Sequence, residues 1–112
     1  MGNNYGTVTN CRFDGYLVGS IAGGIAGENS GTISNCNVLV GRIDNKGVII
    51  PKGSTGSTGG IIGLIPDGIN FTDVIVTGNT YSRTATGQQS GIGQDNRLSP
   101  AGPSDNGTTP LP

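Results

Sequence analysis

The chain has 112 residues and a net charge of −1; glycine accounts for 22 residues, and histidine and tryptophan are missing. This length fits one domain, and the six scattered Lys and Arg residues do not form a basic nucleic-acid surface. No apolar run is long enough to span a membrane. Without histidine the chain cannot build a Ser–His or Cys–His nucleophile. We therefore expect no enzyme activity, no cofactor, no metal, no nucleic-acid partner and no membrane span.

The first predicted unit covers residues 2–11, Gly-Asn-Asn-Tyr-Gly-Thr-Val-Thr-Asn-Cys. Residues 27–36, Gly-Glu-Asn-Ser-Gly-Thr-Ile-Ser-Asn-Cys, repeat it without a gap at an offset of 25 residues. Short Val- and Ile-containing runs between glycines indicate strands joined by tight turns. Self-similarity at this period is typical of stacked repeat units. The sequence therefore predicts an all-β fold, a short parallel β-solenoid (β-helix) of about three rungs.

A looser third copy is expected between Gly63 and Val76, with a two-residue insertion near Pro66. Each copy is accompanied by a Gly-Gly-Ile type run, at residues 23–27 and 59–63, with a remnant at residues 90–93. Their recurrence beside each copy supports stacked repeat units.

Aligning the three copies predicts three apolar columns inside the solenoid, because strand residues alternate between the two faces. The columns are Val8 with Ile33 and Phe71, Cys11 with Cys36 and Val74, and Phe13 with Val38 and Val76. Corners are expected at residues that tolerate the left-handed conformation, namely Asn10, Asn35 and Asp73. An outward surface, which could bind a ligand, would carry Thr7, Thr9, Thr32, Ser34 and Thr72.

Residues 23–36, Gly-Gly-Ile-Ala-Gly-Glu-Asn-Ser-Gly-Thr-Ile-Ser-Asn-Cys, resemble the GLUG motif of large bacterial surface proteins. That family is similar to the filamentous-haemagglutinin class of parallel β-helices. The resemblance is close at 23–36, good at 2–11 and partial at 59–76, and it does not cover 41–58 or the residues after Gly93. It implies a secreted or cell-surface protein, often an adhesin, without enzyme activity or cofactor.

The two cysteines occupy equivalent positions one rung apart, where strands stack about 4.8 Å from each other. Cys11 and Cys36 could therefore form a disulfide by distance. The alternative is a pair of buried thiols, with Val74 continuing the column. Side chains stacked in parallel point the same way, which favours the thiols. No histidine or third cysteine is present to complete a metal site.

Two segments depart from the repeat. Residues 45–58 are rich in Gly, Ser and Thr, and we expect them to form a loop insertion leaving one corner. Residues 94–112 contain Pro100, Pro103, Pro110 and Pro112. Proline supplies no ladder N–H, so this tail cannot form a regular interior rung and should run extended over a surface or be disordered. The predicted organisation is a solenoid over 1–93 followed by a tail over 94–112.

The acidic residues share no column, so the sequence predicts no carboxylate pair for glycoside hydrolysis. Since no catalytic site is predicted, the function is inferred from the two ends of the solenoid. Unpaired strand edges at the two ends invite pairing with another chain, and a head-to-tail contact generates an open filament. We therefore expect a non-catalytic subunit of an extracellular or cell-surface filament, with other copies of itself as partner. The alternatives are an adhesin fragment that binds a host or matrix surface, and ice or glycan binding on the threonine surface. Any secretory signal is expected outside this chain.

Overall fold

The computed structural model describes residues 1–45 and 56–111, and over these residues the protein is all-β with largely parallel sheets. The strands are β1 (Asn3–Asn4), β2 (Thr7–Thr9), β3 (Arg12–Asp14), β4 (Leu17–Val18), β5 (Ile21–Gly23), β6 (Ala26–Asn29), β7 (Thr32–Ser34), β8 (Asn37–Val40), β9 (Ile43–Asp44), β10 (Ser57–Gly59), β11 (Ile62–Ile65), β12 (Ile75–Thr77), β13 (Asn79–Ser82), β14 (Ile92–Asp95), β15 (Gly102–Ser104) and β16 (Thr108–Leu111). A 3-10 turn, η1 (Phe71–Asp73), and one helical turn, α1 (Arg83–Thr86), complete the described elements.

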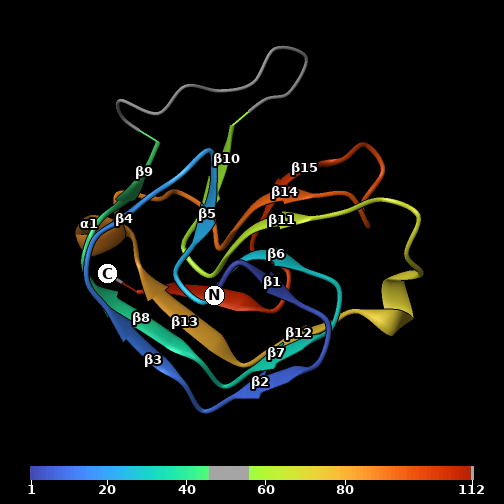
Figure 1. The fold of residues 1–112 in the computed structure, drawn as a ribbon, viewed down its shortest axis with the longest axis horizontal. Helices are drawn as coiled ribbons and strands as arrows, with labels where there is room; N and C mark the ends of the chain where they lie inside the picture. Colours follow the sequence, from blue (N-terminus) through green and yellow to red (C-terminus); the bar gives the residue numbers. More distant parts are fainter. Residues whose placement is uncertain (46–55, 112) are drawn as a thin grey trace.

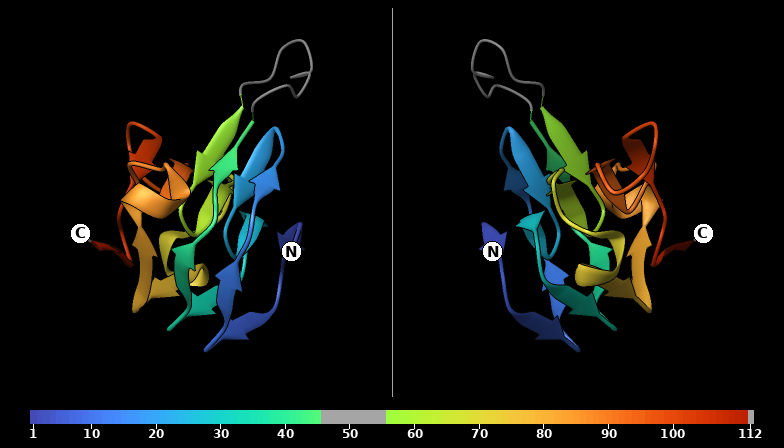
Figure 2. Two further views of the ribbon diagram at one scale, coloured as in Figure 1. Left: turned by 90° about the vertical axis from the view of Figure 1, so that its left-hand side faces the viewer. Right: turned by 90° about the vertical axis from the view of Figure 1, so that its right-hand side faces the viewer.

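Strands of successive circuits lie side by side, so the sheets run across the circuits and not along them. The sheet orders are β1-β6-β11-β14-β15, β12-β7-β2, β16-β13-β8-β3, β10-β5 and β4-β9. Figure 1 looks onto the first circuit, β1 to β5. Figure 2 shows the circuits stacked in chain order, with the two termini at opposite ends of the stack. Two sheets contain four parallel strands each, one more than the expected three rungs.

The first two circuits follow the register that the 25-residue repeat predicts. Val8 pairs with Ile33, and Phe13 pairs with Val38. Ile33 and Val38 are fully buried, whereas Val8 and Phe13 are half-buried because they belong to the outermost circuit. The predicted pairings are therefore confirmed for the first two members of the Val8 and Phe13 columns. In the third column Cys36 is buried as predicted, but Cys11 is exposed and not inside.

The predicted third members of these columns are wrong. Val76, and not Phe71, pairs with Ile33, and Tyr81 replaces Val76 opposite Val38. Phe71 lies in η1 and is 48% exposed. Val74 is buried but lies outside the Cys36 column, where Asn79 takes its place. The physical reason is a longer insertion than expected, because residues 66–74 leave the sheet before β12 begins.

The corner between the second and third strands of each circuit uses the left-handed conformation. Asn10 and Asn35 have φ of 57° and 54°, as predicted, and the same corner in the next two circuits is Gly78 at 67° and Gly107 at 85°. Glycine has no Cβ to oppose this conformation. Asp73 lies in η1, so its assignment to a corner is wrong.

The Gly-Gly-Ile runs stack on one another, as their repetition indicates. Gly59 pairs with Gly23, and the N–H of Gly60 donates to the Ser90 carbonyl at 2.9 Å. A Cβ added at Gly60 would lie 2.5 Å from Cγ of Tyr81. Glycine at this position is therefore required for the close approach of the turn to a fully buried ring.

Buried asparagines form the turn that follows the first strand of each of the first two circuits. Oδ1 of Asn4 accepts the Gly6 N–H, and Oδ1 of Asn29 accepts the Gly31 N–H, both at 3.1 Å. Nδ2 of Asn4 donates to Oδ1 of Asn29 at 2.9 Å and joins the two circuits. The Asn-x-Gly element of the repeat is therefore a hydrogen-bonded turn that stacks on itself.

The tail is part of the fold and not an appendage. β14 continues the β11 sheet in parallel, β15 returns antiparallel on β14, and β16 pairs with β13 in parallel. The boundary expected at residue 93 falls inside β14. Pro110 fits in β16 because β16 is an edge strand, where only one side needs ladder hydrogen bonds. Of the loop expected over 45–58, residues 46–55 lie outside the described residues, and Ser57 already begins β10.

Candidate functional site

The two ends of the stack differ in how their strand edges are covered. We call the face formed by β1 to β5, residues 3–23, the N-terminal end. Within the described residues, each of these strands pairs with a strand of the second circuit and with no other strand. Such edges present unpaired backbone N–H and C=O groups that can template further pairing.

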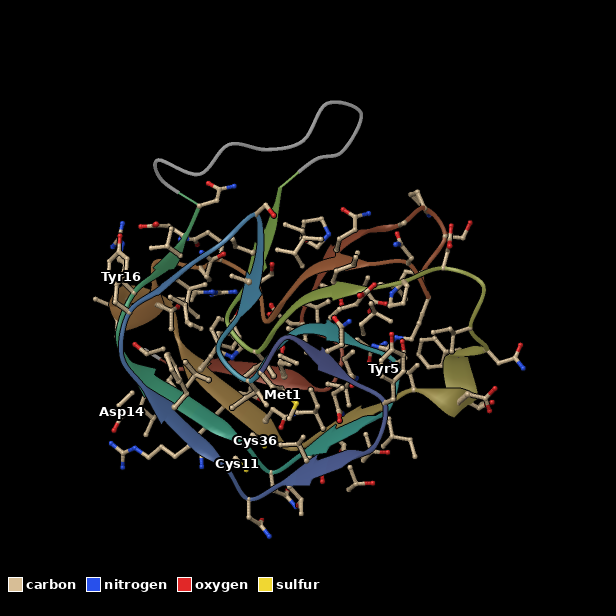
Figure 3. The ribbon with its side chains drawn as sticks, viewed as in Figure 1. Met1, Tyr5, Cys11, Asp14, Tyr16 and Cys36 are labelled. Atoms are coloured by element: carbon tan, nitrogen blue, oxygen red, sulfur yellow. The ribbon has the colours of Figure 1, made fainter. Side chains whose placement is uncertain are left out.

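The first circuit carries several exposed apolar side chains. Tyr5, Tyr16, Val18 and Ile21 belong to the first circuit and are all exposed, as is Met1 (Figure 3). Beside β5 lies a hollow of about 340 Å³, whose lining includes Met1, Val18 and Ile21. An exposed apolar group of this kind, flanked by polar strands, marks an interaction site more often than a free surface.

The opposite end is closed by the chain itself. The edge strands β15 and β16 contain Pro103 and Pro110, and a proline on an edge strand blocks further pairing. Nε2 of Gln88 donates to the Ile43 carbonyl of β9 at 2.6 Å, and its Oε1 accepts from Thr58 of β10 at 3.0 Å. No proline occurs in β1 to β5. β12 is also an edge strand of this end and contains no proline, so the proline-bearing edges are those of β15 and β16.

A buried ion pair fixes the closed end. The Asp95 carboxylate accepts from Nε and Nη2 of Arg97, each at 3.0 Å, and from the Ser104 hydroxyl at 3.0 Å. The two side chains are 0% and 3% exposed. Arg97 also donates to the Val74 carbonyl at 3.2 Å and lies 4.8 Å from the Phe71 ring centre. Burial opposes ionisation of Asp95, but the hydrogen bonds from Arg97 and Ser104 outweigh it and lower the pKa of this carboxyl. The pair joins β14, β15 and the 66–74 insertion.

Asp105 ties the last turn of the chain to the core. Its Oδ1 accepts from the Tyr81 hydroxyl at 2.6 Å and from the Gly91 N–H at 2.8 Å. Burial, followed by the hydrogen bond to Asp105, raises the pKa of Tyr81 to about 12. The neutral tyrosine is therefore favoured in the folded state.

This raised pKa predicts alkaline destabilisation. The contribution of neutral Tyr81 is complete below pH 10 and is lost as the pH rises through 12, because the unfolded chain releases the proton first. We expect the free energy of unfolding to fall by about 2 kcal/mol more in the native protein than in Tyr81→Phe over this window. Urea titrations at several pH values measure it. Tyr5→Phe, at an exposed ring, should behave as the native protein; equal slopes in all three would contradict the assignment.

Both cysteines are free thiols in unlike environments. Cys36 is buried, and desolvation raises the pKa of its thiol, whereas Cys11 is exposed at the edge of the first circuit (Figure 3). Because the thiolate is the reactive form, we expect one thiol to react rapidly with a disulfide reagent in the native protein and the second only after unfolding. Cys11→Ser should remove the rapid phase. Finding no free thiol after denaturation without reductant would show a disulfide instead.

The outward threonine surface is present with a different third row. Thr7 pairs with Thr32 and Thr9 with Ser34. Ile75 and Thr77 of β12 continue these columns, whereas Thr72 lies in η1. The column Thr9, Ser34 and Thr77 is thus one that the sequence alignment missed, and Gly78 at the corner was the signal that could have found it. Ice or glycan binding on this surface stays a prediction.

Residues 1–45 and 56–111 contain no cluster of three or more His, Cys, Asp or Glu side chains arranged to hold a metal ion. No helix in the same residues is both long and apolar enough to cross a membrane. Comparison with known proteins identified no matching family model, no curated relative and no similar solved structure. The chain is therefore interpreted from its own geometry, in which the N-terminal end is the strongest candidate site.

Proposed function

We propose that this protein is a non-catalytic structural module, a short parallel β-solenoid that assembles with copies of itself through its N-terminal end. The observation that carries the proposal is the asymmetry of the stack. The edges of β1 to β5 lack proline and surround exposed apolar side chains, whereas two outer edge strands of the opposite end, β15 and β16, contain Pro103 and Pro110. A surface that evolved to stay unpaired would carry such blocking residues.

This proposal replaces the open head-to-tail filament expected from the sequence with a closed complex. Head-to-tail growth needs both ends to accept strands, and the proline-bearing edges of β15 and β16 disfavour it. Assembly at a single end produces a closed complex instead. An extracellular or cell-surface setting is supported by the resemblance of residues 23–36 to GLUG repeats. The adhesin alternative would use the same stack as a spacer and stays a prediction.

Substituting Ile21 by Lys tests the proposal. Ile21 lies in β5 and is 41% exposed, so a lysine fits there in the monomer. At a self-association surface, however, it would bury a charge without a partner. We expect sedimentation velocity to show a concentration-dependent complex for the native chain and weakening of at least about tenfold for Ile21→Lys.

The matched control is Ile75→Lys, at a residue that is 49% exposed in β12, on the threonine surface. It should associate as the native chain does. A native chain that stays monomeric up to millimolar concentration would overturn the proposed function. Loss of association in Ile75→Lys but not in Ile21→Lys would place the contact on the threonine surface and contradict assembly through the N-terminal end.

A further inference from the structure

The backbone of β3 directs alternate residues to the free edge of the N-terminal end. The β3–β8 register shifts between Phe13 and Asp14, but the Cys11 and Gly15 carbonyls on either side of this shift accept from the N–H groups of Asn37 and Arg42, at 2.9 and 3.0 Å. The odd-numbered residues of this segment, Phe13 included, therefore direct their polar backbone groups toward the second circuit. The backbone groups of Arg12 and Asp14 therefore point away from β8, because neighbouring strand residues face opposite edges. This pattern is what a hydrogen-bonded antiparallel neighbour needs.

The side chains on the same strand are self-complementary. Nε of Arg12 lies 3.2 Å from Oδ1 of Asp14, and both side chains are exposed, at 59% and 49%. They flank Phe13 on either side. When two copies of β3 pair antiparallel with Phe13 opposite Phe13, each Arg12 faces Asp14 of the other copy. Directly opposed unlike charges stabilise an antiparallel pair, whereas like charges destabilise it.

This register also agrees with the direction of the backbone N–H and C=O groups of β3. In an antiparallel ladder, hydrogen-bonded pairs alternate with pairs that have no hydrogen bonds. With Phe13 at the centre as a pair without hydrogen bonds, Arg12 and Asp14 of the other copy become a hydrogen-bonded pair. Those are the residues whose backbone groups point to the free edge. Charge and backbone direction therefore select one register independently.

Exposed tyrosines of the N-terminal end lie on both sides of β3, whose central residue is Phe13. Tyr5 lies on one side of β3, and Tyr16 lies on the other side (Figure 3). A two-fold rotation about an axis beside Phe13 exchanges the two sides. It therefore brings Tyr5 of each copy to the side of β3 on which the other copy carries Tyr16.

From these observations we infer that the partner is a second copy of this chain. It docks on the N-terminal end about a two-fold axis beside Phe13, with β3 pairing antiparallel to β3 and Arg12 opposite Asp14. The inference rests on the proposed self-assembly and adds its symmetry and register. The same patch serves on both copies, so the complex closes at two chains and does not grow.

Charge exchange tests the register. Arg12→Asp gives a chain with two acidic residues around Phe13, and Asp14→Arg gives one with two basic residues. Each variant alone opposes like charges, and we expect its dimer dissociation constant to rise by roughly tenfold or more. A 1:1 mixture restores every unlike pair, because each acidic residue then faces a basic residue of the other chain. Sedimentation equilibrium of the separate and mixed variants measures this.

Asp67→Arg is the charge control, because Asp67 is exposed in the 66–74 insertion and the change in net charge equals that of Asp14→Arg. Its dimer should be unchanged, and circular dichroism should show native strand content for all variants. A mixture that associates no better than the separate variants overturns the inference. Native complexes that grow with concentration beyond two chains overturn the two-fold geometry but leave the proposed self-assembly standing. A strictly monomeric native chain overturns both.

Discussion

Replacing Arg97 by Met is expected to lower the free energy of unfolding by about 3–5 kcal/mol. Met preserves most of the volume of the side chain but removes the two hydrogen bonds to the Asp95 carboxylate, which is 0% exposed. A buried carboxylate that has lost its cation must either remain charged in a poorly solvated site or take up a proton. Since a domain of this size is typically stable by about 5–15 kcal/mol, the variant should lose a large part of its stability.

Urea unfolding followed by circular dichroism measures this loss. The control is Arg12→Met, because Arg12 pairs with Asp14 at a similar distance but at the exposed surface, and exposed pairs contribute at most about 1 kcal/mol. A double variant, Asp95→Leu with Arg97→Met, should recover part of the loss, since it leaves no unpaired charge. Equal effects of Arg97→Met and Arg12→Met would contradict the buried ion pair.

The same pair predicts acid sensitivity. The pKa of Asp95 is lowered in the folded state, so its contribution is present above pH 4 or so and is lost as the pH falls through the lowered folded value. In Arg97→Met this contribution is missing. The native protein should therefore lose more stability than the variant as the pH falls below about 4.

Replacing Asn79 by Leu is expected to cost about 3 kcal/mol, which is the second large effect. Asn79 is fully buried. Its Oδ1 accepts the Cys36 N–H at 2.9 Å, and its Nδ2 donates to the Ile33 carbonyl at 3.0 Å and the Gly107 carbonyl at 3.3 Å. Leucine has a similar size but leaves the Cys36 N–H and the Ile33 carbonyl without these partners, and an unsatisfied buried group costs about 1–3 kcal/mol.

The control for this variant is Asn70→Leu, at an exposed asparagine whose Nδ2 donates to the exposed Asp73 carboxylate at 3.2 Å. It should change the free energy of unfolding by less than about 0.5 kcal/mol. The comparison also tests the register of the third circuit. If Val74 occupied the Cys36 column, as the sequence alignment predicts, Asn79 would lie near the surface and its substitution would be nearly neutral.

The all-β class and the register of the first two circuits could be predicted from the sequence. Residues 2–11 and 27–36 repeat without a gap, so a single offset aligned Val8 with Ile33 and Phe13 with Val38. The corner asparagines were predictable for a second reason, because few residues other than Gly and Asn adopt the left-handed conformation. Local chemistry and repeat spacing agreed at these positions.

The third circuit could not be placed in the same way, because two registers offer the same alternation of residue types. Residues 70–74 and residues 75–79 both contain an apolar residue followed by threonine, and the spacing of the repeat favours the first segment. The structure places the first segment in and around η1 and the second in β12 and β13. Only Gly78 distinguishes them, since it alone suits the corner.

The prolines of residues 94–112 led to the prediction of an extended or disordered tail, whereas this segment contains β15 and β16. The prolines exclude an interior strand, but an edge strand needs hydrogen bonds on only one side, so Pro110 is compatible with β16. Asp95 and Arg97 are neighbours in the sequence, but the burial of their pair depends on contacts with Val74 and Ser104. The role of Gln88 depends on contacts with the distant Ile43 and Thr58. Sequence spacing carries no signal for such contacts, and the closed end was therefore missed.

Amide hydrogen exchange at several protein concentrations tests the central claim most directly. We predict that the amides of Arg12 and Asp14, which point to the free edge of β3, gain protection as the concentration rises. The amides of β15 and β16 should exchange at the same rate throughout, because the proline-bearing end stays unpaired. Protection that grows at β15 and β16, or that never changes at β3, would contradict assembly through the N-terminal end.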